Sequence, residues 1–154
     1  MQGYVGPIEA LTEGNRDFRR VLFTGGHMQL VLMALKPGEE IGAEVHATHD
    51  QFFRIEKGHG EIRLDGVRNK IAAGDAIIVP AGVRHNLINT GKHRLRLYTL
   101  YAPPEHADGL VEATKAKADK HEAARKAAAS AEQGRKDMID EGSPVTSLLP
   151  QGAR

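Results

Sequence analysis

The chain has 154 residues, enough for one domain with a sizeable core and too few for two ordinary ones. With 21 Lys and Arg against 20 Asp and Glu, the charge is balanced, so no net field would draw the protein to nucleic acid or to an anionic membrane. There is no cysteine, which excludes disulfides and thiolate metal ligands. Its start lacks a signal-peptide pattern, and no apolar run approaches the ~18 residues of a membrane span. We therefore expect a cytoplasmic protein that binds neither nucleic acid nor membrane.

Residues 1–102 carry short, β-branched-rich runs separated by Gly, Pro and Asp, which is typical of an antiparallel β domain. Hairpin turns are predicted at Lys57-Gly58 and Asp65-Gly66, where Gly supplies the positive φ that tight turns need. Many short strands with no helical period between them indicate an all-β sandwich or small barrel. Strands are predicted at residues 18–25, 28–35, 40–46, 51–58, 60–66, 69–74, 76–82, 85–90 and 94–102.

Residues 103–154 differ in composition from the rest and form an appendage to the barrel. The stretch TKAKADKHEAARKAAASAEQ, residues 114–133, is rich in Ala and has no large apolar residue. A helix is predicted there, with Thr114 as N-cap and Glu122 paired with Lys126 one turn later. Because Ala offers little surface to bury, the stability of this helix would rest on intrinsic propensity. We expect a flexible tail after it.

The stretch GDAIIVPAGVRHNLIN carries Gly74, Pro80, Gly82, His85 and Asn89 at a characteristic spacing. This arrangement resembles the second conserved motif of the cupin superfamily, G-x5-P-x-G-x2-H-x3-N, at every specified position. The resemblance implies a single-domain cupin fold: a small antiparallel β-barrel, also described as a jelly roll or double-stranded β-helix. It also implies that His85 is a metal ligand.

The stretch EVHATHDQFFRIEKG resembles the first cupin motif, G-x5-H-x-H-x3/4-E-x6-G, with two substitutions. Its spacing places Glu44 at the first histidine, His46 at the second and Gln51 at the glutamate. The resemblance thus implies metal ligation by Glu44, His46 and Gln51 together with His85. Strand geometry agrees for the first pair, because residues two apart face the same side, whereas His49 has the opposite parity and falls outside the set.

Two imidazoles, one carboxylate and one amide oxygen suit a single divalent transition metal: Zn, Fe, Mn, Co or Ni. In the alternative, the metal has been lost, and the Glu and Gln side chains hydrogen-bond a ligand or each other. Phe53, Ile55 and Leu87 share the parity of the candidate ligands and would form apolar walls. Of Tyr98 and Tyr101, at most one faces inward. The remaining histidines have different expected places: His27, His59 and His93 on the surface, and His106 on a segment able to fold over the barrel mouth.

Cupin barrels host many activities, so the resemblance leaves the function open. One reading is a metal-dependent enzyme acting on a small polar substrate, a sugar or a keto or hydroxy acid, by isomerase, lyase or dioxygenase chemistry. Glu44, if it is not locked to the ion, is the candidate catalytic base. Small cupins of this kind are often described as mannose-6-phosphate-isomerase-like. The other reading is a non-catalytic small-molecule binder. In either case exposed edge strands favour a homodimer.

Overall fold

The structure is a computed structural model, and it describes residues 2–140. The chain forms two compact units, one up to Ala118 and one from Asp119 onward. The first unit includes residues beyond the predicted division at 102, because Ala118 belongs to the barrel core and is 4% exposed. The predicted flexible tail after residue 140 lies outside the described residues.

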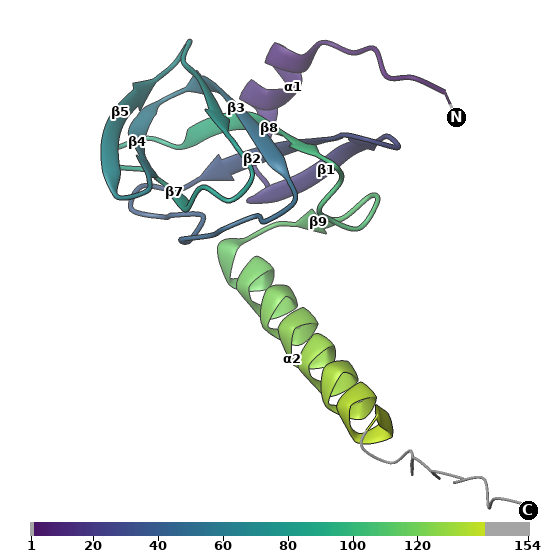
Figure 1. Cartoon of the computed structure of the whole chain (residues 1–154). Helices are drawn as coiled ribbons and strands as arrows, with labels where there is room; N and C mark the ends of the chain where they lie inside the picture. The colour runs from purple at the N-terminus through teal and green to yellow at the C-terminus, as the bar shows by residue number, and fades with distance from the viewer. Residues whose placement is uncertain (1, 141–154) are drawn as a thin grey trace, which may run out of the picture. The chain divides into compact units, whose positions relative to one another are not determined.

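The first unit is a barrel of two facing antiparallel sheets (Figure 1). The larger sheet has the strand order β6-β3-β8-β2-β1-β9, and the smaller one has the order β5-β4-β7. The strands are β1 (Arg19–Thr24), β2 (Gln29–Leu35), β3 (Asp50–Lys57), β4 (His59–Leu64), β5 (Val67–Ala72), β6 (Ala76–Val79), β7 (His85–Ile88), β8 (Leu95–Ala102) and β9 (Val111–Glu112). This is the all-β barrel with a helical appendage that the sequence predicts.

Alternating side chains along the strands build the core between the two sheets. In β8 every second residue is buried, so Leu97 and Tyr101 face inward while Tyr98 faces outward. In β3 the same alternation buries Phe53 and Ile55, both 0% exposed. Each fully buried side chain of this size contributes about 1.5–3 kcal/mol to folding. The predicted inward positions and the division between the two tyrosines are confirmed.

Two turns predicted from glycine have different outcomes. Asp65 and Gly66 both have positive φ, 47° and 83°, and form the two-residue loop of the β4–β5 hairpin. Gly58 also has a positive φ of 88°, but β3 and β4 do not pair with each other. The predicted hairpin at Lys57-Gly58 is therefore wrong: the turn carries the chain from one sheet to the other.

The predicted strand over residues 40–46 is wrong as a continuous strand. This segment forms only isolated bridges, Glu40 with Ile88 and Glu44 with His85. Gly42, with a φ of 105°, interrupts the extended conformation. The segment still runs antiparallel beside β7, so it adds an irregular edge to the smaller sheet.

The sequence did not predict two short elements of the first unit. Helix α1 (Ile8–Gly14) has no side-chain cap, and Thr12 within it is completely buried. Strand β9 pairs with β1 over two residues, and its Glu112 forms a buried ion pair of 2.7 Å with Arg19. An alternating or helical pattern of apolar residues must extend over several residues to be recognised, and these elements are too short for that.

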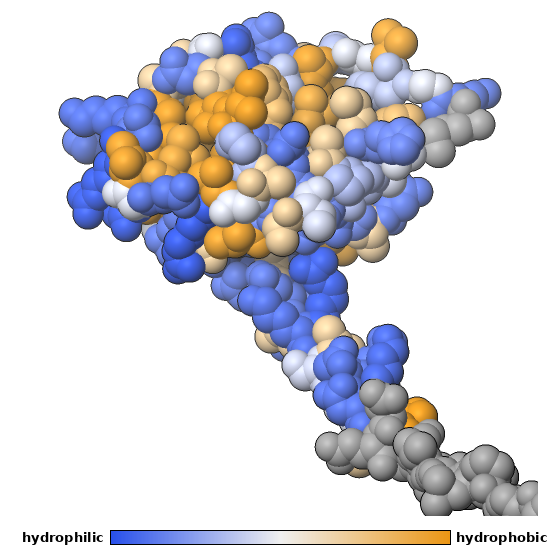
Figure 2. All heavy atoms as spheres, in the orientation of Figure 1, coloured by the Kyte–Doolittle hydropathy of each residue, from blue (hydrophilic) through white to orange (hydrophobic). Residues whose placement is uncertain are grey.

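Helix α2 (Lys115–Asp140) confirms the prediction for the Ala-rich stretch. The hydroxyl of Thr114 accepts the Lys117 N–H at 3.2 Å, as an N-cap does, and Glu122 pairs with Lys126 at 3.1 Å. From residue 119 to 139 the side chains are exposed except for the half-buried Glu122. In Figure 2 the barrel shows an apolar area around β3, β4 and β5, whereas the visible surface of α2 is mostly polar. Among the described residues, no helix has the length and apolar character needed to cross a bilayer.

Candidate metal centre

A β-bulge beside β7 brings Glu44 to the inside of the barrel. The Ile41 N–H donates to the Leu87 carbonyl at 2.9 Å, and Glu44 and His85 exchange two backbone hydrogen bonds of 2.9 Å. Positions 41 and 44 are three apart, whereas their partners 87 and 85 are two apart, so the segment contains one extra residue. Regular alternation would turn residues 41 and 44 to opposite faces. With the bulge at Gly42, Ile41 packs in the core and Glu44 lies beside His85.

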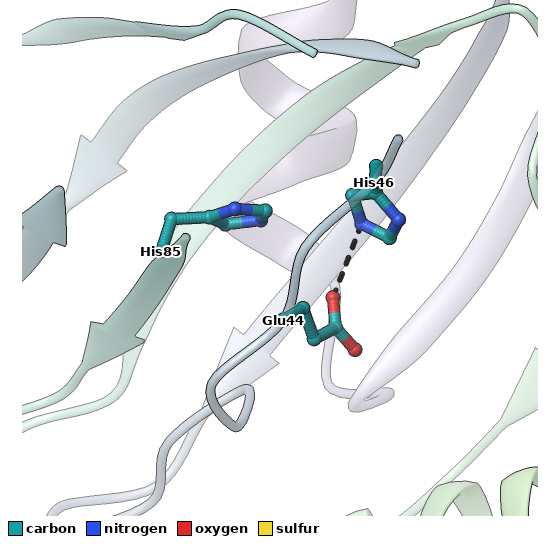
Figure 3. A group of neighbouring side chains, drawn as sticks. All are labelled: Glu44, His46 and His85. Carbon is teal, nitrogen blue, oxygen red and sulfur yellow. Dashed lines mark ion pairs between the residues drawn. The ribbon is translucent and has the colours of Figure 1, made fainter. Parts of the chain in front are cut away.

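Glu44, His46 and His85 converge from two segments that are distant in sequence (Figure 3). Each offers one ligand atom, and these atoms all lie within 4.8 Å of one another. The Nε2 atom of His46 lies 3.2 Å from Oε2 of Glu44, and the two side chains are 13% and 21% exposed. The cluster is therefore partly shielded from water, yet a small ion or molecule can reach it.

Gln51 joins this cluster from β3. It is 2% exposed, its Oε1 atom lies 3.2 Å from Nε2 of His85, and its Nε2 atom donates to Thr99 at 3.0 Å. All four side chains that the sequence predicts as ligands thus come together at one place inside the barrel.

The hydrogen bonds of His85 leave two acceptors facing each other. Its Nδ1 atom contacts the Val83 carbonyl at 3.0 Å, and because a carbonyl only accepts, Nδ1 carries the proton. In the neutral ring, Nε2 then presents a lone pair, and it faces the carbonyl oxygen of the Gln51 amide. Two acceptors at this separation are stable with a proton or a metal ion between them, or with the amide rotated so that its NH₂ group donates to Nε2.

The spacing of the donor atoms fits a transition-metal ion. With bonds of about 2.0–2.2 Å to nitrogen and oxygen, neighbouring ligand atoms in an octahedral or tetrahedral shell lie roughly 2.8–3.6 Å apart. The separations between His46 and Glu44 and between His85 and Gln51, 3.2 Å each, fall in this range. The residues present therefore fit a divalent ion bound by imidazole nitrogen and by carboxylate and amide oxygen.

Electrostatics favours the ligand form of the carboxylate. Burial acts to raise the pKa of Glu44, but the hydrogen bond and charge of His46, with the charges of Arg19 and His85, outweigh it and lower the pKa below its usual value. Glu44 is therefore ionised at neutral pH. Burial raises the pKa of the neighbouring Tyr101 phenol, which keeps that group neutral and able to donate a hydrogen bond.

His49 lies beside the cluster but is engaged elsewhere. Its ring contacts the edge of the His46 ring at 5.9 Å between centroids, while its Nε2 atom lies 3.2 Å from Oε2 of Glu105. The three histidines predicted to lie on the surface, His27, His59 and His93, are exposed. His106 is half-buried, and its ring packs against Tyr101 at 5.1 Å.

Sequence reasoning missed two charged groups that border the cluster. Glu105 follows the last long strand, and no periodicity or motif marks it. Arg19, which is 7% exposed, looks like an ordinary strand residue until its buried partner Glu112 is known. Only the inward parity of Arg19 relative to Val21 offered a signal.

Comparisons with known proteins point to one family. A family model described as a cupin domain matches residues 31–101. The uncharacterized protein YrkC of Bacillus subtilis is 45% identical over 121 residues, which are 75% of this chain and 65% of that protein. An uncharacterized protein of Acanthamoeba polyphaga mimivirus is 41% identical over 116 residues, 72% of each chain. This chain therefore spans somewhat less than two-thirds of the length of the first relative.

A solved structure agrees with the sequence relatives. The crystal structure of a protein from Bacillus halodurans matches with a TM-score of 0.76 and 42% identity, covering 77% of this chain and 95% of that one. The two-sheet barrel, the inward cluster at the positions of both motifs and these matches lead to the same conclusion. The chain belongs to the cupin superfamily.

Proposed function

We propose that this protein binds one divalent transition metal through Glu44, His46 and His85, with the Gln51 oxygen as a fourth ligand. The observation that carries the proposal is the convergence of these donors: three ligand atoms lie within 4.8 Å of one another, and the Gln51 oxygen lies 3.2 Å from Nε2 of His85. A metal ion would accept both lone pairs at once. It would also balance the ionised carboxylate in a site that is largely shielded from water.

We further propose that the metal centre acts on a small, oxygen-rich molecule, a sugar or a keto or hydroxy acid. When bound, the ion supplies Lewis-acid chemistry, which polarises a carbonyl group. The chain supplies two groups beside it. Glu44, ionised at neutral pH, is the candidate proton acceptor if the ion does not hold it, and the neutral phenol of Tyr101 is a candidate hydrogen-bond donor to the substrate. Isomerase and lyase reactions fall within this chemistry, including an activity of the mannose-6-phosphate isomerase type, whereas a dioxygenase reaction would require a redox-active ion such as iron.

Metal analysis tests the proposal directly. Protein purified without a metal-affinity tag should contain close to one transition-metal ion per chain by mass spectrometry of the digested sample. Replacing His46 or His85 with Ala should lower both the metal content and the metal-dependent part of the melting temperature, because an ion that binds only the folded state stabilises it. His27→Ala removes an exposed histidine and is the matched control. A metal content that stays well below one per chain after reconstitution would contradict the proposal.

The same side chains suggest a second candidate, a non-catalytic binder of small molecules. If the Gln51 amide were rotated by half a turn, its NH₂ group would donate to His85 and its oxygen would accept from the Thr99 hydroxyl. The cluster would then be satisfied without an ion. Melting curves with and without a chelator separate the two candidates. After chelation, sugars and keto acids should still raise the melting temperature if the protein binds them without a metal. They should not raise it if the metal holds the ligand.

We also propose that the protein forms a homodimer, because its sheets end in strands with an unpaired edge. Strand β6 ends the larger sheet, and its Ile78 is 68% exposed. An unpaired apolar edge is a template for association. Light scattering coupled to size-exclusion chromatography should give twice the chain mass, and the mass of a single chain would refute this.

A further inference from the structure

The side chain of Gln29, at the start of β2, makes four hydrogen bonds, three to backbone groups and one to a hydroxyl, and we call this arrangement the clamp. Gln29 is 0% exposed. Its Nε2 atom donates to the His106 carbonyl at 2.7 Å and to the Thr24 hydroxyl at 3.0 Å. Its Oε1 atom accepts the N–H groups of Glu105 at 3.2 Å and of His106 at 2.9 Å. The amide therefore uses both of its donors and both lone pairs, which is its full capacity.

Three of these four hydrogen bonds fix the backbone of residues 105 and 106, which follow β8. An N–H group and a carbonyl that are buried without partners each cost about 1–3 kcal/mol, so this short stretch has one strongly favoured position. The clamp thereby sets where the side chains of Glu105 and His106 begin.

Both of those side chains lead to His46, a residue of the candidate metal centre. Glu105 lies 3.2 Å from His49, whose ring contacts the His46 ring at 5.9 Å between centroids. His106 packs edge-on against Tyr101 at 5.1 Å, and Tyr101 packs edge-on against His46 at 5.9 Å. Two separate chains of contacts thus run from the clamped backbone to one imidazole.

The strand register places the clamp in the same layer as the centre. Gln29 pairs with Tyr101, and Tyr101 pairs with Gln51 on its other side. Residues paired in register face the same side of a sheet, so these three side chains form one inward row across β2, β8 and β3. Gln29 is two strands away from Gln51, and its four side-chain hydrogen bonds go to Thr24, Glu105 and His106 rather than to a candidate ligand.

We propose that Gln29 is a positioning residue of the metal centre: it fixes the backbone of residues 105 and 106, whose side chains hold the His46 ring in place through His49 and Tyr101. The inference rests on the proposed metal-binding function. Groups that orient a ligand without touching the ion typically change metal affinity by about 10–100-fold when they are removed.

The barrel contains a second amide of the same kind that serves as a matched control. Asn89 is 1% exposed; its Nδ2 atom donates to the carbonyls of Leu35 at 2.9 Å and His93 at 2.8 Å, and its Oδ1 atom accepts the Gly91 N–H at 2.9 Å. It ties a turn to the last residue of β2, whereas Gln29 is the first residue of that strand. The turn it holds contains none of the candidate ligands.

The experiment compares Gln29→Leu, Gln29→Glu and Asn89→Leu with the wild type. Gln29→Leu and Asn89→Leu each delete a buried amide clamp, so both should lower the melting temperature of the metal-free protein. Only Gln29→Leu should weaken Co²⁺ binding, by at least about tenfold in competition with a chelator, and alter the visible absorption bands of bound Co²⁺. Gln29→Glu keeps the two acceptor bonds to the 105 and 106 N–H groups, so its loss of affinity should be smaller.

A measurement on the metal-free protein tests the positioning role of Gln29 separately from the proposed metal-binding function. The His46 imidazole signals in NMR spectra should broaden or shift in Gln29→Leu and stay unchanged in Asn89→Leu. Equal Co²⁺ affinity in Gln29→Leu and wild type, or equal losses in both Leu variants, would overturn the positioning role. If the wild type takes up no Co²⁺, the proposed function fails, and unchanged His46 signals would then overturn the role of Gln29 as well.

Discussion

Gln51 sets the charge of the candidate centre. It stands where the cupin motif has a glutamate, and its oxygen faces His85 while its NH₂ group donates to Thr99. With Gln51 neutral, Glu44 is the single carboxylate among the four side chains. The site therefore carries one negative charge before an ion binds, and an ion of charge two would leave it with a net positive charge that suits an anionic substrate.

Replacing Gln51 with Glu should tighten metal binding by at least about tenfold at neutral pH, because a second carboxylate raises the attraction for a divalent ion. The Thr99 hydroxyl can turn to donate to the new carboxylate, so the packing is preserved. The metal-free variant should melt lower than the wild type, since it buries an unbalanced charge. Isothermal titration and melting curves measure the two effects.

Gln133→Glu is the control for this substitution, because it makes the same change at an exposed site on α2. It should alter neither the affinity nor the melting temperature of the barrel. Unchanged metal affinity in Gln51→Glu would mean that the Gln51 oxygen does not face the ion.

The sequence reveals the site residues that belong to a local motif and misses those placed by long-range contacts. His85, His46, Glu44 and Gln51 stand at fixed spacings within two motifs, so the spacing alone brought them out. Gln29 and Glu105 depend on contacts between segments separated by more than seventy residues. No local pattern records such a contact, and a buried glutamine at the start of a strand looks like any polar strand residue.

The bulge beside β7 is the element that makes the site possible. A regular strand over residues 40–46 would place either Ile41 in the core or Glu44 at the centre, but not both. Gly42→Ala should therefore weaken metal binding, because a side chain is strained at a φ of 105° even though no atom lies within 4 Å of the added carbon. The stability loss should be about 1–2 kcal/mol by denaturant unfolding.

Gly66→Ala separates strain from the site. Gly66 has a φ of 83° and equally open surroundings, but it lies in the β4–β5 hairpin. It should lose similar stability and keep its metal affinity. Equal metal affinity in both alanine variants would show that the bulge does not control the position of Glu44.

A buried ion pair joins the short strand β9 to β1. Arg19 and Glu112 are 7% and 2% exposed, and their side chains meet at 2.7 Å. Glu112→Ala should lower the free energy of unfolding by about 3–5 kcal/mol, because it leaves the guanidinium buried without its partner. The double variant Arg19→Met with Glu112→Leu should recover most of that loss. A small effect of Glu112→Ala would indicate that water or another group replaces the carboxylate.

The elements that the sequence revealed are those with a period or a turn residue. The alternation in β3 and β8 and the Asp65-Gly66 loop were predictable because each repeats or fixes a local geometry. The pairing partner of a strand was not: Gly58 looks like a hairpin glycine, yet the strands on either side belong to different sheets. Long-range pairing decides that outcome, and the turn sequence carries no record of it.

The whole molecule divides into a barrel that folds around its core and a helix with little to bury. From Asp119 to residue 139 only Glu122 is half-buried, and the rest are exposed. A chain that ends at Lys120 should therefore keep the melting temperature and metal content of the full protein while losing helical signal in circular dichroism. A lower barrel melting temperature in the shortened chain would contradict this division.

Gly134→Ala should raise the helical circular dichroism signal of the full chain, since Gly costs a helix about 1 kcal/mol relative to Ala.

The paired backbone bonds between Glu44 and His85 have a consequence for how the ion is gained and lost. They tie the two ligand-bearing segments together through the main chain, so we expect the metal-binding site to be formed before an ion binds. The ion then binds to a site that is already folded. In zinc fingers, by contrast, metal binding drives folding. Stripping the metal with a chelator should leave the barrel amides protected, with exchange through global unfolding faster only by the stabilisation that the ion supplied, and reloading should be fast and complete without any refolding step.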